Sequence, residues 1–301
     1  MEEKMIVTNR KEKVGYYLFL LPAYLIFAVF IFWPVVHSLY LSFFKYNIVT
    51  ITSPQFVGLR NYLYLLKDEV FWISCKNTLF FVIGTVPVKM FLGLLAAMLL
   101  NRKDLKFKAF YRTCFYIPVV VSMVAISIVW MLLFNPGPNG VVNILLSKFG
   151  IQPLGWIADS KLALPTVMLL VIWKDLGYIM VIYLAGLMAI PDEIYEAVAL
   201  DPVSSWQKFW YITWPLLKPT TIFILITQVI DSFQVFTPIY VMTEGGPGYS
   251  STTIVNYLYD KGFREYEMGI ACAVAYLLFV VLLVLTILQN KLSKAEEVSY
   301  D

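Results

Sequence analysis

The chain has 301 residues, of which 60% are hydrophobic and 14% are charged. Soluble domains average about 45–50% apolar and about 25% charged residues, so this composition excludes a water-soluble globular protein. The formal net charge of +3 is small and is explained by the membrane topology described below. No nucleic-acid partner is therefore expected.

The apolar residues collect into runs of about 20 residues, the length needed to cross a hydrocarbon core about 30 Å thick. Six such runs follow one another, at 16–36, 78–100, 113–134, 162–187, 219–242 and 267–288. The first is longer than the apolar region of a signal peptide, and no small-x-small cleavage site follows it. The sequence therefore predicts an all-α, polytopic membrane protein with six transmembrane helices.

Lysine and arginine are unequally distributed among the connections between these runs. Both terminal segments and the second and fourth connections carry more of them, including a cluster at Arg102, Lys103, Lys106, Lys108 and Arg112. Positively charged flanks stay on the cytoplasmic side of a membrane. Both termini are therefore expected in the cytoplasm.

Several runs are interrupted by prolines, such as Pro22 and Pro34 in the first, Pro87 in the second, Pro118 in the third and Pro238 near the end of the fifth. Such breakers are tolerated where neighbouring helices or a water-filled cavity satisfy the freed backbone groups. The external connection 135–160 is rich in turn residues, and its apolar stretch from Val141 to Leu146 is a candidate surface helix.

No motif for a metal, a cofactor or a nucleotide is found. The glycines of 243–251 lack the Gly-Lys-Ser/Thr ending of a phosphate-binding loop. Cys75, Cys114 and Cys272 have no metal-ligand spacing, and His37 has no companion ligand. We expect this chain to bind no metal or cofactor and to contain no catalytic residue.

The fourth connection, residues 191–215, is predicted to form two short helices joined by a turn. Pro191 suits a first helical position, and the two acidic residues after it complement the positive end of the helix dipole. Asp201 is predicted to cap the second helix, with Pro202 at its first position.

The second predicted helix is unusually aromatic, with Trp206, Phe209, Trp210 and the segment Ile212 to Trp214. Such a cluster needs a covering surface. Trp and Tyr are enriched at membrane interfaces, so the aromatic residues fit either a position in that interface or docking against another protein. The residues alone leave both alternatives open.

The same connection resembles the EAA loop of ABC importer permeases. That pattern is Glu-Ala-Ala, three residues, Gly, nine residues and Ile-x-Leu-Pro. The residues in register are Glu196, Ala197, Ile212 and Pro215. This chain departs from the pattern at three positions, with Val198 for the second Ala, Pro202 for the Gly and Trp214 for the Leu.

The resemblance covers nearly the whole chain. Shorter strings resemble the carbohydrate-uptake branch that includes the maltose permeases; they are Phe56 to Tyr62, Asn77-Thr78, Leu184 to Leu187 and Gly245 to Gly248. The resemblance implies the type I ABC importer permease fold in a bacterial or archaeal cytoplasmic (inner) membrane. It also implies a domain division into 1–15 (tail), 16–70 (first helix and external loop), 71–289 (ABC transmembrane type-1 domain, with coupling loop 191–215) and 290–301 (tail).

The resemblance further implies partners. In that family the loop contacts a cytoplasmic ATPase subunit, which places Glu196, Ala197 and Asp201 at the contact. The expected partners are two such ATPases, which bind ATP and Mg, a second and non-identical permease subunit, and an extracellular or periplasmic solute-binding protein. This chain would then hydrolyse nothing itself.

Four charged residues fall well inside the predicted spans: Lys89, Lys174, Asp175 and Asp231. Each costs about 2.5–3.5 kcal/mol at the centre of a membrane helix, so each is expected to face the bundle interior or a wet cavity. Lys174 and Asp175 are adjacent and do not share a helix face, so each needs a partner on another helix.

The fifth run carries a polar stripe of Thr227, Asp231 and Gln234 at i, i+4 and i+7, with Gln228 beside it. This stripe is the main candidate for lining a solute pathway. The other candidates are the charged residues above together with Trp173 and Tyr178, whose rings would stack on sugars. The alternative is a structural network between helices.

The expected function is alternating access, in which ATP-driven closure of the ATPases moves the spans through loop 191–215. An ion-coupled secondary transporter and an integral membrane enzyme are the alternatives. The enzyme is disfavoured by a single histidine and by the lack of a paired-carboxylate motif.

Overall fold

The computed structural model describes residues 10–49, 53–199 and 202–294. Contacts divide the chain into two units. The N-terminal unit comprises residues 1–65 and 261–276, and the main unit comprises residues 66–260 and 277–301. The last helix, α14 (Met268–Lys294), begins in the first of these and ends in the second.

The N-terminal unit starts with a continuous helical segment, in which the π-helix η1 (Ala28–Phe32) joins α1 (Arg10–Phe27) to α2 (Trp33–Ser42). Short strands β1 (Phe44–Lys45) and β2 (Gln55–Phe56) pair antiparallel, and α3 (Arg60–Leu65) follows. The Asn61 amide donates to the carbonyls of Ser42 and Phe44 at 2.8 and 2.9 Å. The π-helix η4 (Asp260–Arg264) leads into α14.

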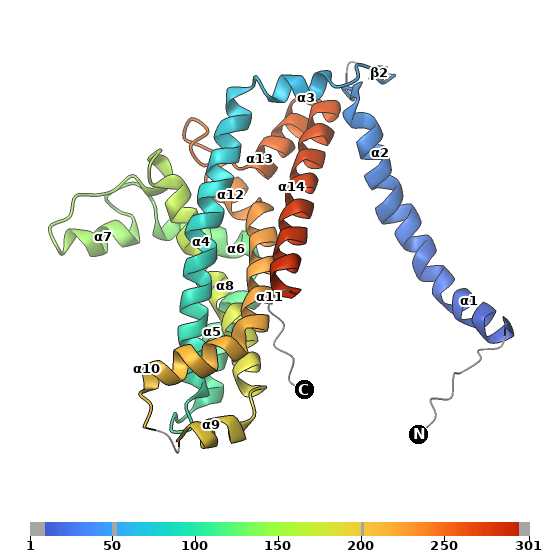
Figure 1. The fold of residues 1–301 in the computed structure, drawn as a ribbon. Coiled ribbons are helices and arrows are strands. Elements are labelled where there is room, and N and C mark those ends of the chain that lie inside the picture. The colour runs from blue at the N-terminus through green and yellow to red at the C-terminus, as the bar shows by residue number, and fades with distance from the viewer. Residues whose placement is uncertain (1–9, 50–52, 200–201, 295–301) are drawn as a thin grey trace. The chain divides into compact units, whose positions relative to one another are not determined.

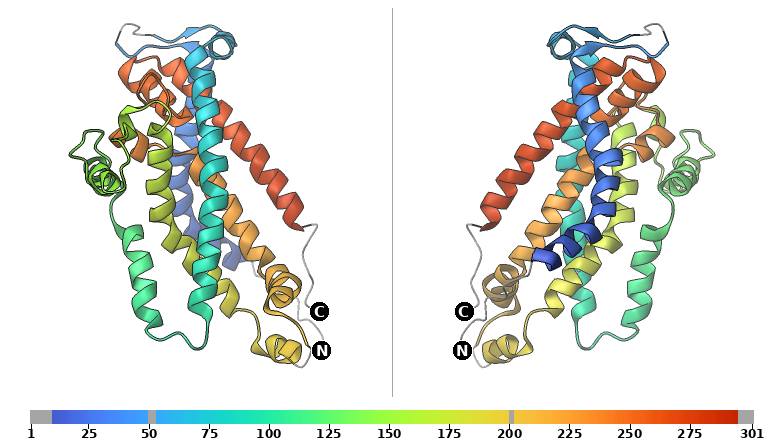
Figure 2. Two further views of the ribbon diagram at one scale, coloured as in Figure 1. Left: turned by 90° about the vertical axis from the view of Figure 1, so that its left-hand side faces the viewer. Right: turned by 90° about the vertical axis from the view of Figure 1, so that its right-hand side faces the viewer.

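The main unit is a bundle of long helices (Figures 1 and 2). Its first part comprises α4 (Glu69–Asn101), α5 (Lys108–Val120), α6 (Met123–Leu133), α7 (Val141–Ser147), η2 (Trp156–Ala158) and α8 (Ala163–Met188). Its second part comprises α9 (Asp192–Ala199), α10 (Ser205–Lys208), η3 (Phe209–Thr213), α11 (Trp214–Phe233), α12 (Thr237–Met242) and α13 (Ile254–Tyr259).

Helices α4, α8 and α11 pack together along the bundle. Small and large apolar side chains such as Ala97, Tyr183 and Leu217 form one core between these three helices. Phe81 and Leu170 form a second core with α12. These cores fix the spacing of the helices that carry the buried charges.

Glycines permit close approaches in this bundle. A Cβ atom at Gly177 of α8 would lie 2.0 Å from the carbonyl oxygen of Phe115, so α5 and α8 touch through their backbones. At Gly84 the neighbour at 2.1 Å is the terminal methyl of Met168, a flexible side chain.

Five helical segments in the described residues are long and apolar enough to cross a membrane, or six if the bent pair α5 and α6 forms one span. The prediction of a polytopic all-α protein is confirmed. The third run, 113–134, contains an interruption as its proline indicated, and it is divided into α5 and α6, which are bent by 96°. The carbonyl of Val119 beside the break accepts a hydrogen bond from the Lys174 ammonium at 3.0 Å, so α8 satisfies a backbone group of the broken helix.

The fifth run, 219–242, is also not one helix. Helix α11 ends at Phe233, and α12 is a separate short helix with Pro238 in its first turn. Pro238 has no N–H to donate to the carbonyl of the residue four positions earlier, Gln234, and its ring would clash with that carbonyl, whereas proline favours the first turn of a new helix, which explains the interruption. Gln234 therefore lies one residue past α11 instead of on its face.

The surface helix expected within 135–160 is present as α7. The connection around it is held by Asn143, which is 1% exposed. Its amide donates to the carbonyls of Asn135, Gly137 and Leu154, and its Oδ1 accepts from the Leu154 N–H and the Trp156 indole.

Candidate functional site

The connection 191–215 forms two short helices, as predicted, but their starts differ from the prediction. Pro191 lies directly before α9 and not inside it, and its carbonyl accepts the N–H of Ile194 at 3.2 Å. Asp192 and Glu193 occupy the first turn of α9. Glu196 and Ala197 follow on α9 and are both exposed.

The second helix begins later than predicted, at Ser205. Ser204 caps it, because the Ser204 hydroxyl accepts the N–H of Gln207 at 3.2 Å and the Gln207 Oε1 accepts the N–H of Ser204 at 2.9 Å. This reciprocal capping box satisfies two backbone donors. Pro202 lies outside the helix, so its prediction as first helical residue is wrong. Asp201, the predicted cap, lies outside the described residues.

Helix α10 continues without a loop into α11, which is part of a segment long and apolar enough to cross a membrane. The π-helix η3 (Phe209–Thr213) follows directly after Lys208, the last residue of α10. Helix α11 begins at Trp214, the next residue after η3 (Figure 1). Ile212 lies in η3 and Pro215 in the first turn of α11. The last residues of the EAA-like pattern thus form the base of a membrane helix.

An aromatic surface covers this base, and we define it as Trp206, Phe209, Trp210, Tyr211 and Trp214. Four of these rings contact one another, with centroids 5.3 to 6.4 Å apart. Trp206 is 70% exposed and Tyr211 is 76% exposed. Phe209 and Trp214 are half-buried against the core between α4, α8 and α11. The exposed aromatic side chains indicate a contact with a protein or with the membrane interface.

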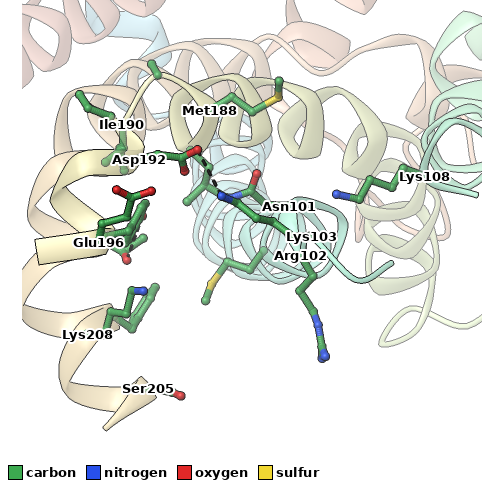
Figure 3. A pocket seen from close by; sticks show the side chains of 17 residues that line it. Asn101, Arg102, Lys103, Lys108, Met188, Ile190, Asp192, Glu196, Ser205 and Lys208 are labelled. Carbon is green, nitrogen blue, oxygen red and sulfur yellow. Dashed lines mark hydrogen bonds and ion pairs between the residues drawn. The ribbon is translucent and has the colours of Figure 1, made fainter. Parts of the chain in front are cut away.

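Beside this surface lies a cavity of about 880 Å³ (Figure 3). It is lined by the end of α4, the segment 102–108, the end of α8, and α9 and α10. The Lys103 ammonium lies 3.2 Å from the Asp192 carboxylate, and both side chains are exposed. Glu196 and Lys208 line the same cavity.

Two further contacts join α9 to the helix that follows it. The Lys208 ammonium lies 4.5 Å from the centre of the Tyr195 ring, a cation–π contact. The Tyr195 hydroxyl lies 3.2 Å from the hydroxyl of Thr213.

At the end of α4, the Arg102 guanidinium holds the pKa of the Asp104 carboxyl below its usual range through a hydrogen bond of 2.7 Å.

A second group of polar residues lies in the interior of the bundle. Lys89 of α4 is fully buried, and its ammonium lies 3.1 Å from the carboxylate of Asp175 on α8 and 3.4 Å from the hydroxyl of Ser232 on α11. Lys174 points to the other side of α8 and donates to the carbonyl of Val119. Each member of the adjacent charged pair therefore has a partner on another helix.

Two cavities adjoin this group. One, of about 290 Å³, is lined by Val119, Asp175, Tyr178, Thr227, Gln228 and Asp231. The other, of about 210 Å³, is lined by residues that include Lys89, Asp175, Asp231, Ser232 and Gln234. Asp175 and Asp231 belong to both.

The structure brings together seven of the nine predicted pathway candidates around these cavities: Thr227, Asp231, Gln228, Gln234, Asp175, Lys89 and Tyr178. Lys174 and Trp173 line neither cavity. The Trp173 ring instead packs on Trp130, with centroids 5.7 Å apart. Sequence reasoning missed Ser232, whose only signal is its place next to Asp231.

Comparison with known proteins identifies the family. Residues 89–296 match the family described as "Binding-protein-dependent transport system inner membrane component". The chain is 35% identical to the lactose transport system permease protein LacF of Rhizobium radiobacter, over 95% of this chain and 97% of LacF. It is 36% identical to the trehalose/maltose transport system permease protein MalF of Thermococcus litoralis, over 95% of each chain.

A solved structure shares the fold. It is a bacterial ABC transporter involved in the import of the acidic polysaccharide alginate, which matches with a TM-score of 0.83 at 26% identity and covers 95% of this chain and 96% of that chain. The fold expected from the resemblance, that of an ABC importer permease, is confirmed. The chain is a multi-pass membrane protein and a transport component, and it belongs to the family of binding-protein-dependent transport system inner membrane components.

Proposed function

We propose that this chain is one membrane-spanning subunit of an ATP-driven importer for a carbohydrate or a related polyol or polyol phosphate. The similarity to LacF and MalF, whose names give lactose, trehalose and maltose as solutes, supports a carbohydrate. The importer would lie in the cytoplasmic membrane of a bacterium or archaeon, with both termini of this chain in the cytoplasm. A solute-binding protein on the outer side would deliver the solute.

The observation that carries the coupling part of this proposal is the exposed aromatic surface next to the 880 Å³ cavity. The surface offers exposed aromatic side chains, which are enriched at protein contacts, and the cavity beside it offers the polar groups found at the rims of such contacts. Because α10 runs on into α11, movement of the contact would displace the helix that carries Asp231. Glu196, Ala197 and Asp201 are proposed as contact residues of a cytoplasmic ATPase.

The partners follow from this arrangement. One chain supplies one such contact, so two ATPase subunits, which bind ATP and Mg²⁺, require a second permease subunit. We propose a non-identical paralogue as that subunit. The chain itself would bind no cofactor or metal.

The alternatives make different predictions. An ion-coupled secondary transporter would take up solute without any ATPase partner and would respond to an ion gradient. A membrane enzyme would convert its substrate without moving it. Uptake that requires both ATP hydrolysis and a binding protein separates the proposal from both.

The test replaces Glu196 by alanine in the complete transporter, reconstituted in liposomes with its binding protein. Glu196 lines the cavity, so we expect ATP-driven solute uptake to fall at least about tenfold, either because the ATPase no longer assembles or because hydrolysis is uncoupled. Asp201→Ala is expected to act in the same way. The matched control is Glu193→Ala, since Glu193 is exposed on the same helix but does not line the cavity. Normal uptake in both the Glu196 and Asp201 variants would remove the assignment of this contact.

A further inference from the structure

Helix α9 carries the exposed residues Glu196 and Ala197, the proposed contacts of an ATPase, but it is not continuous with α11, the helix that would have to move. In the connection from α9 to α10, residues 202–204 are not helical. Movement is transmitted well by packed side chains and hydrogen bonds between rigid elements. Side-chain contacts between α9 and the later helices are therefore the features that can link the two.

The half-buried face of α9 consists of Ile194, Tyr195 and Val198, at i, i+1 and i+4. Tyr195 contacts two later segments. The Lys208 ammonium, at the end of α10, lies 4.5 Å from the centre of the Tyr195 ring, and the Tyr195 hydroxyl lies 3.2 Å from that of Thr213, at the end of η3. Thr213 is 7% exposed, so the two hydroxyls are shielded from water.

The π-helical turn of η3 allows one tyrosine to hold both partners. Its hydrogen bonds join residues five apart, as the bond from the Trp214 N–H to the Phe209 carbonyl shows. Lys208 and Thr213 are also five residues apart, so they lie closer to one side of this turn than in an α-helix, where they would be about 140° apart. Single π-helical turns within helices are frequent at functional sites.

The contact with Thr213 leads directly into the membrane helix. Helix α11 begins at the next residue, and its Trp214 and Leu217 pack in the core between α4, α8 and α11. Displacement of Thr213 therefore acts on a rigid, packed helix. By contrast, the ion pair between Asp192 and Lys103 joins α9 to the segment after α4, and both of its side chains are exposed, so it holds α9 weakly.

We propose that Tyr195 is the positioning residue through which movement of α9 reaches α11. Its ring holds α10 through Lys208, and its hydroxyl holds the end of η3 through Thr213. The inference rests on the proposed function and names the side chain that links the ATPase contact to the membrane helix. The exposed face of α9 meets the ATPase, and Tyr195 on the half-buried face passes the displacement on.

The test measures two distances between spin labels by double electron–electron resonance in the complete transporter in nanodiscs, with and without trapping by ATP and vanadate. Cys75, Cys114 and Cys272 are first replaced by alanine. Leu79→Cys on α4 is the reference position. It is paired with Glu193→Cys to report movement of α9, and with Phe223→Cys to report movement of α11. All three labelled positions are exposed.

With Tyr195 intact, we expect trapping to shift both distances. Tyr195→Leu removes the ring and the hydroxyl, so the α11 shift should fall to less than about half while the α9 shift remains. Tyr195→Phe keeps the ring over Lys208 and should retain more of the α11 shift. Thr213→Val removes the other hydroxyl, so it should match Tyr195→Phe, and the double variant should be no more severe.

The matched control is Tyr116→Phe, which removes a hydroxyl from an exposed tyrosine outside the 880 Å³ cavity and both interior cavities. It should leave both shifts unchanged. A merely structural role of Tyr195 would lower the yield of assembled complex without changing the ratio of the two shifts.

A full α11 shift in Tyr195→Leu, or loss of both shifts in assembled complexes of that variant, would overturn the inference. If Tyr195→Leu does not assemble, Tyr195→Phe and Thr213→Val decide, and a full α11 shift in both would overturn it. None of these results changes ATP-driven uptake with Tyr195 intact, the test of the proposed function. Absence of both shifts with Tyr195 intact would overturn both.

Discussion

Replacing Lys89 by methionine would remove the buried charge opposite Asp175 and keep an unbranched side chain of similar length. The two charged atoms lie 3.1 Å apart, and the side chains are 0% and 20% exposed. With an effective dielectric constant of about 20, the Coulomb attraction over this distance is about 5 kcal/mol. Desolvation offsets part of it, but Lys89→Met leaves the Asp175 carboxylate in the bundle interior without its partner. We expect the free energy of unfolding to fall by about 3–5 kcal/mol.

The assay is unfolding of the purified chain by SDS titration in mixed micelles. The matched control is Lys103→Met, which breaks an ion pair of nearly equal length, 3.2 Å, whose side chains are 86% and 69% exposed. We expect this exposed pair to contribute at most about 1 kcal/mol. Burial is then the main difference between the two substitutions.

A double variant completes the test. Lys89→Met combined with Asp175→Leu removes both charges, and replacing a whole buried pair by apolar residues is often neutral or stabilising. We expect the double variant to unfold at a higher SDS fraction than Lys89→Met alone. Equal losses in the Lys89 and Lys103 variants, or a double variant less stable than Lys89→Met, would refute the reasoning.

Two further outcomes are expected. Gly177→Ala should lower the free energy of unfolding by about 2–3 kcal/mol in the same SDS titration, because the new Cβ meets the backbone carbonyl of Phe115. Gly84→Ala should lower it by less than about 1 kcal/mol, since only the flexible methyl of Met168 must move. Asn143→Ala should loosen the connection 135–160 and accelerate tryptic cleavage after Lys148 several-fold, while Asn139→Ala, an exposed change in the same connection, should not. Equal effects within either pair would contradict these contacts.

The fold class was predictable because membrane spanning depends on length and hydrophobicity, which are local properties. The positions of the breaks were not. Pro118 suggested an interruption, yet the bend of 96° falls between α5 and α6, after Val120. The break is accompanied by a hydrogen bond from Lys174, which lies 55 residues away in the chain. Such a contact exists only after the helices have packed.

The candidate site shows the same division. The sequence indicates that Lys174 and Asp175 need partners on other helices, but it does not reveal that Lys89 is the partner of Asp175. The start of α10 was readable, since Ser204 and Gln207 have capping-box spacing. The neighbouring pair Asp201-Pro202 suggested an earlier start of α10. The two signals are of similar local strength, so the sequence alone does not decide between them.

The burial of Lys89 also has a consequence for the synthesis of the protein. Its partner Asp175 lies 86 residues later in the chain. At a translation rate of about 5–20 residues per second, Lys89 is added to the chain about 4–17 s before Asp175. An unpaired lysine costs about 2.5–3.5 kcal/mol at the centre of a membrane helix. The apolar residues of α4 must therefore hold the helix at the insertion machinery or in the bilayer until α8 arrives and neutralises the charge.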